Sequence, residues 1–233
     1  MGSPSIRVTN TEPGVRPPVS GDVDLRSVPR GYPLKRIIDI GIAGFAILLL
    51  LPVGVIIALL VATSGGPVFY VADRRGAGGR IFRMYKFRTM VPGADAVLDA
   101  YLQGDLEARR QYMRTYKIKD DPRITVMGGF LRRFSLDELP QLINVVRGDM
   151  SLVGPRPRGE VEFAAMSGDR LFAAYYLCRP GMTGPWQVSG RSGTDYQTRL
   201  ELDADYAREL SLGGDLLILA KTVPVALVGT GAY

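Results

Sequence analysis

The longest uncharged stretch of the chain constrains its fold more than any other feature. No charged residue occurs from Ile40 to Ala72, and the range Ile40–Thr63 reads IGIAGFAILLLLPVGVIIALLVAT. As a helix, this part is roughly 36 Å long, enough to cross a hydrocarbon layer of about 30 Å. It is too long for the hydrophobic region of a signal peptide, and buried helices of soluble proteins are rarely so uniformly apolar. The stretch therefore predicts insertion into a membrane.

Basic residues lie on both sides of this stretch. Those before it are Arg26, Arg30, Lys35 and Arg36, and those after it are Arg74, Arg75, Arg80, Arg83, Lys86 and Arg88. Because Lys and Arg favour the cytoplasmic side of a membrane, both flanks are expected there. Pro52 lies near the middle, and a proline inside a helix costs on the order of 3 kcal/mol and bends it. We therefore expect residues 32–66 to form a re-entrant membrane helix broken near Pro52; a straight span is the alternative.

The rest of the chain divides on either side of this helix. Residues 1–31 contain repeated prolines and no apolar period, which is typical of a disordered N-terminal arm. Residues 67–233 are expected to form one domain at the cytoplasmic face, because 233 residues with 46% hydrophobic content can bury one core. The expected fold is α+β and mostly helical, with a small β-hairpin and interfacial amphipathic helices.

The composition restricts the chemistry that the chain can perform. It contains no histidine and a single cysteine, Cys178. This excludes histidine-dependent catalysis and histidine metal sites, and it leaves oxygen ligands for Mg²⁺, Mn²⁺ or Ca²⁺. Cys178 has no partner for an internal disulfide and is expected to pack in the interior. The formal net charge of +6 implies an anionic partner: a nucleic acid, a membrane surface or a phosphorylated substrate.

A β-hairpin is predicted directly after the apolar stretch. Val68–Val71 and Ile81–Arg88 are rich in aromatic and β-branched residues, and Gly76–Gly79 between them is typical of a turn. Lys86 and Arg88 lie on the same face of the second strand. Their charge fits either anionic lipid headgroups or a substrate phosphate, and the pattern alone does not separate the two.

Further helices are expected after this hairpin. The predicted ranges are residues 91–119, ending at Asp120-Asp121-Pro122; a helix capped by Asp195 that runs to about Leu210; and an interfacial helix over Asp215–Val228. Gly128-Gly129 predicts a break between helical segments. Arg179–Leu200 is rich in proline and glycine and therefore predicts a structured loop. Its Trp186, Gln187, Ser189 and Arg191 are candidates for the wall of a site.

The stretch Ser135–Pro157 carries the strongest chemical signal. Asp137 and Glu138 open a predicted helix, and the basic loop Gly154–Arg158 follows about one helix length later. Carboxylates beside guanidinium groups suit the joint binding of a metal and a phosphate. The structural alternative is a capping box formed by Ser135 and Glu138.

An apolar stripe along this helix separates its polar residues from the expected core. The stripe consists of Leu136, Leu139, Leu142, Ile143 and Val146. The residues off the stripe are Asp137, Glu138, Gln141 and Asn144, and we expect them to face a polar environment.

Six motifs, in order along the chain, resemble one family. They are KRIIDIGIAG (35–44), GGPVFY (65–70), YKFRTM (85–90), DDPRIT (120–125), SLDELPQLINVVRGDMSLVGPRPR (135–158) and RPGMTGPWQVSGR (179–191). The chain resembles the bacterial sugar transferases, the monotopic polyprenyl-phosphate phosphoglycosyl transferases. Its length and its GAY ending are similar to the exopolysaccharide-initiating members, which transfer galactose-1-phosphate or glucose-1-phosphate to undecaprenyl phosphate.

The resemblance implies a mechanism at the cytoplasmic face of the bacterial inner membrane. Asp137 would attack the sugar-bearing phosphorus of a UDP-sugar, and undecaprenyl phosphate would then receive the sugar phosphate from that aspartyl intermediate. Glu138 would bind Mg²⁺, for which Mn²⁺ is a substitute. Residues 67–233 then form the catalytic domain. Its predicted substrate- and phosphate-binding residues are Lys86, Arg88, Arg156, Arg158, Gln187 and Arg191.

Two other functions are compatible with part of the sequence. A non-catalytic, membrane-bound cationic scaffold for polysaccharide assembly explains the apolar helix and the charge, but not the Asp137–Glu138 pair beside Gly154–Arg158. A nucleic-acid partner is not expected, because the basic residues cluster at the membrane boundary and no recognised nucleic-acid-binding motif occurs. A homodimer is left open.

Overall fold

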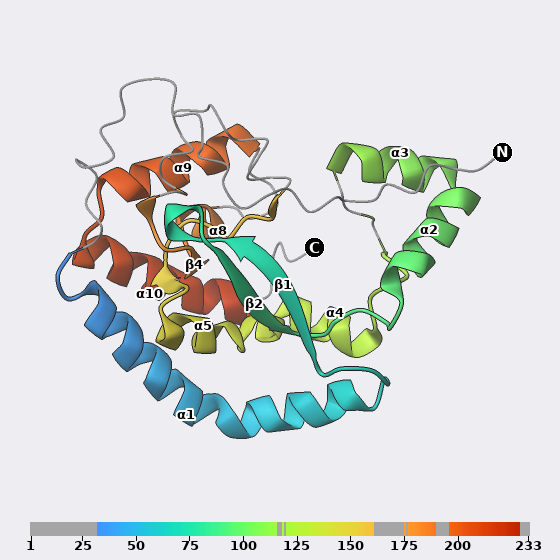
Figure 1. The fold of residues 1–233 in the computed structure, drawn as a ribbon, viewed down its shortest axis with the longest axis horizontal. Helices are drawn as coiled ribbons and strands as arrows, with labels where there is room; N and C mark the ends of the chain where they lie inside the picture. The colour runs from blue at the N-terminus through green and yellow to red at the C-terminus, as the bar shows by residue number, and fades with distance from the viewer. Residues whose placement is uncertain are drawn as a thin grey trace.

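The computed structural model describes residues 32–115, 118, 120–160, 175, 177–189 and 196–228. The described elements form a helical body around a small hairpin, with one long helix along its edge and a two-helix arm at the other side (Figure 1). This agrees with the predicted mostly helical α+β fold. The predicted N-terminal arm, the cap at Asp195 and the candidate Arg191 lie outside the described residues.

Helix α1 (Lys35–Ala62) contains the apolar stretch. Within the described part of the chain it is the one helix long and apolar enough to cross a membrane. Pro52 lies inside α1, so the helix bends without ending at the predicted break (Figure 1). Its buried residues are confined to its two ends: Asp39, Ala43, Ile57 and Val61. The apolar middle is exposed, and Leu48, for example, retains 74% of its accessible surface.

The predicted hairpin is confirmed. Strand β1 (Phe69–Arg75) pairs antiparallel with β2 (Ile81–Phe87), joined by the short helix η1 (Ala77–Gly79). β1 continues beyond the predicted end at Val71. Its last residue is stabilised by a contact outside the hairpin, because the Arg75 N–H donates to the carbonyl of Arg158 at 3.1 Å. The hairpin is thereby tied to the basic loop.

The predicted helix over residues 91–119 is two helices, α2 (Ala94–Gly104) and α3 (Leu106–Thr115). Asp105 separates them, because its carboxylate accepts hydrogen bonds from the N–H groups of Glu107 and Ala108, both at 2.9 Å. An aspartate that caps a new helix start in this way ends the preceding one. The pair forms the arm that extends from the body in Figure 1.

The predicted break at Gly128-Gly129 is wrong, because helix α4 (Val126–Arg133) runs through both residues. Thr125 caps this helix by accepting a hydrogen bond from the Gly128 N–H at 2.9 Å. A Cβ atom on Gly128 would lie 2.0 Å from the carbonyl oxygen of Thr89. Glycine serves close backbone packing here, and an isolated helical glycine is tolerated at modest cost.

The central helix is divided into η2 (Leu136–Glu138) and α5 (Gln141–Arg147). The predicted capping box does not form, since Ser135 is left-handed with φ 56° and its side chain caps nothing. Pro140 has no N–H to donate, so it fits at the start of α5. Gly148, with φ 90°, ends α5 in the left-handed conformation that glycine adopts readily.

The predicted loop after Arg179 contains regular structure. Strand β4 (Gly181–Thr183) pairs in parallel with β3 (Ser151–Val153), and the short helix α8 (Pro185–Val188) follows. Two longer helices complete the body: α9 (Tyr196–Arg208) and α10 (Leu212–Val228). The last helix starts three residues before its predicted first residue, and it packs on β3, β4 and α8.

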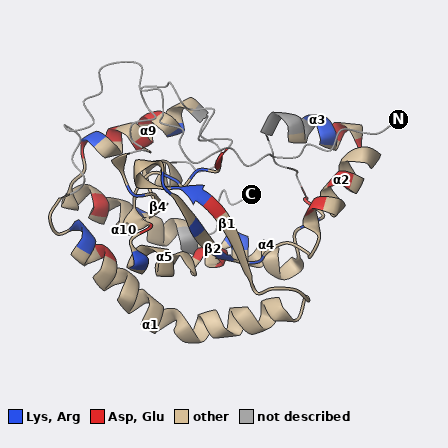
Figure 2. Ribbon diagram, in the orientation of Figure 1, with Lys and Arg blue, Asp and Glu red and all other residues tan. Residues whose placement is uncertain are grey.

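Three apolar clusters form the core. The first joins the hairpin, α5 and β3 to Ala43 of α1, and the third joins Ile57 and Val61 of α1 to Phe87 and Leu131. The second lies against α9 and contains Cys178, which is buried as predicted. The two ends of α1 thus belong to different clusters of one body. Between them the helix carries no charge (Figure 2).

Candidate active site

A pocket of about 180 Å³ lies between the hairpin, the η2–α5 segment, the basic loop and β4–α8. Its lining includes four residues that the sequence singled out: Lys86, Glu138, Arg156 and Gln187. It also includes Arg74 and Gln141, which the sequence analysis did not assign to a site. Segments more than 100 residues apart in the chain therefore meet here, as expected for the Ser135–Pro157 stretch and the Arg179 loop.

The two adjacent carboxylates meet one lysine. The Lys86 Nζ atom donates to Glu138 Oε1 at 2.6 Å and lies 3.9 Å from Asp137 Oδ2. Lys86 reaches them because residues on alternate positions of β2 share a face, which is the face turned toward η2. Asp137 is 8% exposed, so the structure buries the polar face that was expected to meet a polar environment.

Burial raises the pKa of Asp137 to about 6. The negative charge of Glu138 acts in the same direction, while the positive charges of Lys86 and Arg132 lower this pKa. The carboxylate is still ionised at neutral pH, but it is poorly hydrated. A desolvated anion beside cations suits nucleophilic attack on a phosphorus whose charge those cations neutralise.

Arg132 is a residue that the sequence analysis missed. It lies at the end of α4, its Nε atom donates to the Thr89 hydroxyl at 2.8 Å, and burial lowers the pKa of its guanidinium. Basic residues are common in the last turn of a helix because they interact favourably with the helix dipole. The sequence alone therefore did not mark Arg132 as a site residue.

Asn144 joins α5 to β2, the strand that carries Lys86. Its side chain is fully buried, accepts a hydrogen bond from the Tyr85 N–H at 3.1 Å and donates to the Arg83 carbonyl at 2.7 Å. The carboxamide thereby occupies hydrogen-bonding groups of β2, directly before Lys86. The sequence predicted that Asn144 faces a polar environment. In the structure its side chain is hydrogen-bonded to the backbone of the hairpin strand β2.

The basic loop is held by close backbone contacts with β4. The Gly154 N–H donates to the Thr183 carbonyl at 2.9 Å, and the Gly181 N–H donates to the Pro155 carbonyl at 2.8 Å. A Cβ atom on Gly181 would lie 2.1 Å from the Gly154 nitrogen, so the approach requires glycine. Arg156 remains exposed at the pocket, with its guanidinium 5.4 Å from the centre of the Trp186 ring.

Two predicted phosphate ligands, Arg88 and Arg158, lie outside the lining of the pocket. The Arg88 Nη2 atom donates to the Val61 carbonyl at 3.1 Å and to the Ser64 hydroxyl at 2.9 Å, at the end of α1. Arg158 is 4% exposed and donates to the Tyr175 hydroxyl at 3.0 Å. Guanidinium groups satisfy exposed helix carbonyls and buried hydroxyls as readily as phosphates, so sequence alone could not distinguish these roles.

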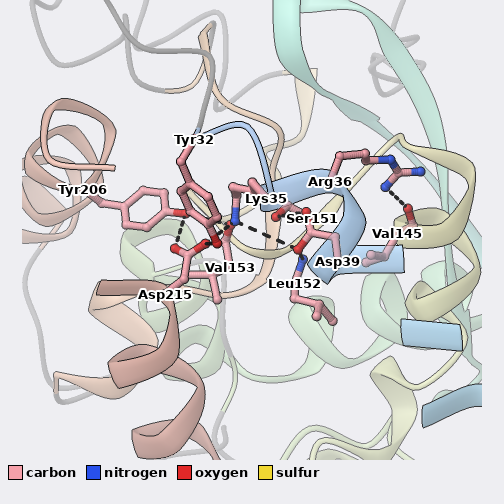
Figure 3. Close-up of polar contacts among 10 residues, drawn as sticks. All are labelled: Tyr32, Lys35, Arg36, Asp39, Val145, Ser151, Leu152, Val153, Tyr206 and Asp215. Atoms are coloured by element: carbon pink, nitrogen blue, oxygen red, sulfur yellow. Dashed lines mark hydrogen bonds and ion pairs between the residues drawn. The ribbon is translucent and has the colours of Figure 1, made fainter. Parts of the chain in front are cut away.

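A polar cluster fixes the start of α1 to the strand that precedes the basic loop (Figure 3). We call it the anchor cluster; it consists of Tyr32, Lys35, Asp39, Ser151, Tyr206 and Asp215. In it the Asp39 carboxylate accepts from the Ser151 hydroxyl at 2.8 Å and from the Leu152 N–H at 3.1 Å. Nearby, Arg36 donates to the Val145 carbonyl at 2.5 Å and so joins α1 to α5 as well.

Asp215 at the start of α10 closes the anchor cluster. Its carboxylate lies 2.5 Å from Lys35 Nζ and accepts from the hydroxyls of Tyr32 at 2.9 Å and Tyr206 at 2.8 Å (Figure 3). Burial, followed by the influence of Asp215, raises the pKa of both tyrosines, so both hydroxyls stay protonated as donors. Helix α1 therefore meets β3 and α10 through fully paired groups.

The carboxylate pair Asp137 and Glu138 supplies oxygen atoms that could bind a metal ion. Among the described residues, no group of three or more Cys, Asp or Glu side chains could hold a metal ion. Mg²⁺ usually takes one or two protein carboxylates and completes its shell with substrate phosphates and water. Glu138 at the pocket wall, with Asp137 beside it, fits that donor set.

The fold combines a long apolar helix with a pocket lined by carboxylate and basic side chains, and comparison with known proteins identifies the family that has this combination. Residues 30–229 match the family described as bacterial sugar transferase. The UDP-galactose-lipid carrier transferase of Erwinia amylovora is 48% identical over 200 residues, which are 86% of this chain and 42% of that protein. The exopolysaccharide production protein ExoY of Rhizobium meliloti is 43% identical over 206 residues, 88% of this chain and 90% of ExoY.

A third relative is the UDP-glucose:undecaprenyl-phosphate glucose-1-phosphate transferase of Caulobacter vibrioides, 37% identical over 238 residues, 99% of this chain and 80% of that protein. The chain spans less than half the length of the Erwinia relative and nearly all of ExoY. The chain belongs to the bacterial sugar transferase family, as its motifs indicated.

Proposed function

We propose that the protein transfers a hexose-1-phosphate from a UDP-sugar to undecaprenyl phosphate, and so starts the synthesis of an exopolysaccharide. The observation that carries this proposal is the buried Asp137 carboxylate, with its pKa raised to about 6, beside Lys86 in a pocket that Arg156 also lines. The names of relatives support the reaction class, since they describe transfer of galactose or glucose phosphate to a lipid carrier.

The proposed reaction has two steps. An Asp137 oxygen attacks the phosphorus that carries the sugar, the bond from that phosphorus to the bridging oxygen breaks, and UMP leaves with the electron pair. A phosphate oxygen of undecaprenyl phosphate then attacks the same phosphorus, and the bond to Asp137 breaks. The carboxylate is restored, and a polyprenyl diphosphate sugar is formed. Lys86 and Arg156 neutralise charge on the transferring group.

We infer that Glu138 holds Mg²⁺, with Asp137 close to the ion. The ion would neutralise part of the negative charge of the sugar nucleotide's diphosphate. In the free protein the Lys86 ammonium lies 2.6 Å from Glu138 and neutralises the charge of that carboxylate. This reduces the repulsion between Glu138 and Asp137.

The shape of α1 supports a re-entrant anchor at the cytoplasmic face of the bacterial inner membrane. Both ends of α1 pack on the same body, while its middle carries exposed apolar side chains such as Phe45, Leu48 and Leu49. Basic residues flank both ends, as the positive-inside rule requires for a helix that leaves by the face it entered. Exposed Ile143 and Val146 of α5 add to this apolar side.

The proposal is tested by UMP release from a panel of UDP-sugars, with detergent-solubilised protein, Mg²⁺ and undecaprenyl phosphate. Release with one sugar that is lost on adding a chelator would establish the reaction class. Folded protein that releases no UMP with any sugar, yet sediments with anionic liposomes, would favour the cationic scaffold.

A further inference from the structure

The pocket contains two carboxamide side chains whose hydrogen-bonding capacity is not used. Gln141 is 2% exposed, and its Nε2 atom has no hydrogen-bond partner among the described residues. The Oε1 atom of Gln187, across the pocket on α8, is also buried and without a partner in that part of the chain. Buried polar groups are nearly always paired, so two orphans in one small pocket call for an explanation.

We propose that Gln141 and Gln187 bind hydroxyl groups of the donor's hexose and set which sugar is transferred. This inference rests on the function proposed above. It concerns the hexose of the donor, because the cations of the pocket account only for binding of the phosphates.

The chemistry of the two groups points away from phosphate. A phosphate oxygen only accepts hydrogen bonds, and Arg74, Lys86 and Arg156 supply donors for it in the same pocket. The amide oxygen of Gln187 also only accepts, so it needs a ligand that donates. The amide nitrogen of Gln141 needs a ligand that accepts. A sugar hydroxyl does both, and so does the imide edge of uracil.

The position of Gln141 favours the sugar over the base. Gln141 follows Asp137 by four residues and Glu138 by three, on the segment that holds the carboxylates. Gln141 and Glu138 also line the same pocket. The phosphorus that Asp137 attacks carries the hexose directly, whereas the base is separated from it by the second phosphate and the ribose.

Hydroxyl recognition gives the selectivity that related enzymes would need. Galactose and glucose differ in the orientation of one hydroxyl, and the names of relatives divide between these two sugars. A site that hydrogen-bonds a hydroxyl rejects the sugar that lacks it in place, because its own polar groups are then left unpaired. Charged groups that bind the diphosphate would bind both donors with similar affinity, because the diphosphate is the same in both.

The test compares Gln141→Met and Gln187→Met, which keep side-chain length and remove the amide. For each variant, kcat/KM is measured with UDP-galactose and UDP-glucose, and the inhibition constant of UMP is measured in the same assay. Gln197→Met, at an exposed position on α9, is the matched control. We expect each pocket variant to reduce the ratio between the two donors at least about tenfold, with UMP inhibition changed less than about twofold.

Thermal unfolding separates recognition from a structural role. Because Gln141 Nε2 has no partner among the described residues, Gln141→Met is expected to keep or raise Tm. An unchanged donor ratio in both variants would overturn the sugar assignment, and a parallel loss of UMP inhibition would move the two residues to the base. Wild-type protein that turns over neither donor would instead contradict the proposed function itself.

Discussion

The anchor cluster and the candidate pocket use similar residues and differ in how completely those residues are paired. In the anchor cluster, Asp215 has three polar partners between 2.5 and 2.9 Å. In the pocket, Lys86 pairs with Glu138 at 2.6 Å but lies 3.9 Å from Asp137, and Gln141 Nε2 has no hydrogen-bond partner among the described residues. Paired buried charges hold elements in place, whereas incompletely paired ones keep their capacity for a ligand. The comparison predicts opposite responses to mutation in the two regions.

The largest difference is expected from Asp137→Asn. The change removes the proposed nucleophile, so UMP release should fall by at least about 1000-fold. It also removes a carboxylate whose ionisation burial opposes, so Tm should stay the same or rise. UMP release, the mass of the intact protein after reaction with a UDP-sugar, and thermal unfolding measure the three effects.

Asp205→Asn, at a carboxylate that is 62% exposed, is the control for that experiment. Near-normal turnover by Asp137→Asn would exclude the aspartyl intermediate. A sharp fall in its Tm would show that Asp137 is a structural member like Asp215, and the distinction between the two regions would fail.

The anchor cluster should respond in the opposite way to Lys35→Met. Lys35 and Asp215 are 2.5 Å apart, with side chains 14% and 5% exposed. Removing one partner of such a buried pair leaves the other charge uncompensated and costs about 3 kcal/mol of unfolding free energy. Urea unfolding in detergent measures this loss. Arg208→Met breaks an exposed pair with Asp205, 2.7 Å apart, and should change the stability little. Equal effects of the two variants would contradict the anchoring role.

Asn144→Leu tests a residue outside both regions, which is hydrogen-bonded like the anchor cluster and contacts β2, the strand that carries Lys86. The variant leaves the Tyr85 N–H and the Arg83 carbonyl without their side-chain partner, at a cost of about 2 kcal/mol. The Tyr85 amide should exchange its hydrogen faster, whereas amides paired across the hairpin should not. Unchanged exchange at Tyr85 would show that Asn144 does not hold β2.

The elements with a strong local signal could be predicted from the sequence. The uncharged run predicted α1, and the aromatic strands around Gly76–Gly79 predicted the hairpin, because each pattern has few alternatives. Glu138 and Arg156 of the Ser135–Pro157 stretch line one pocket, so the structure brings together the two charge types that the sequence singled out there. Their role as a site stays a prediction.

Features that depend on tertiary partners could not be predicted. Arg88 and Lys86 share one strand face, yet one meets the end of α1 and the other meets Glu138. Gly128 looked like a helix break because its close contact, the Thr89 backbone, lies far away in sequence. Ser135 and Glu138 have the capping-box spacing, but the left-handed turn at Ser135 directs the chain into η2. Local propensity was overruled by packing in each case.

The smallest expected effect is a shift in pH dependence. Asp137 must be ionised to attack, so kcat/KM for UMP release should fall about tenfold per pH unit below its pKa of about 6. Lys86 lowers that pKa, so Lys86→Met should move the acid limb to higher pH by up to about one unit, besides reducing the rate. Arg83→Met removes the same charge from an exposed position of β2 and should leave the limb in place. If Lys86→Met lowers the rate without moving the limb, then Lys86 binds substrate but does not tune the nucleophile, and the incomplete pairing of Asp137 would have no catalytic consequence.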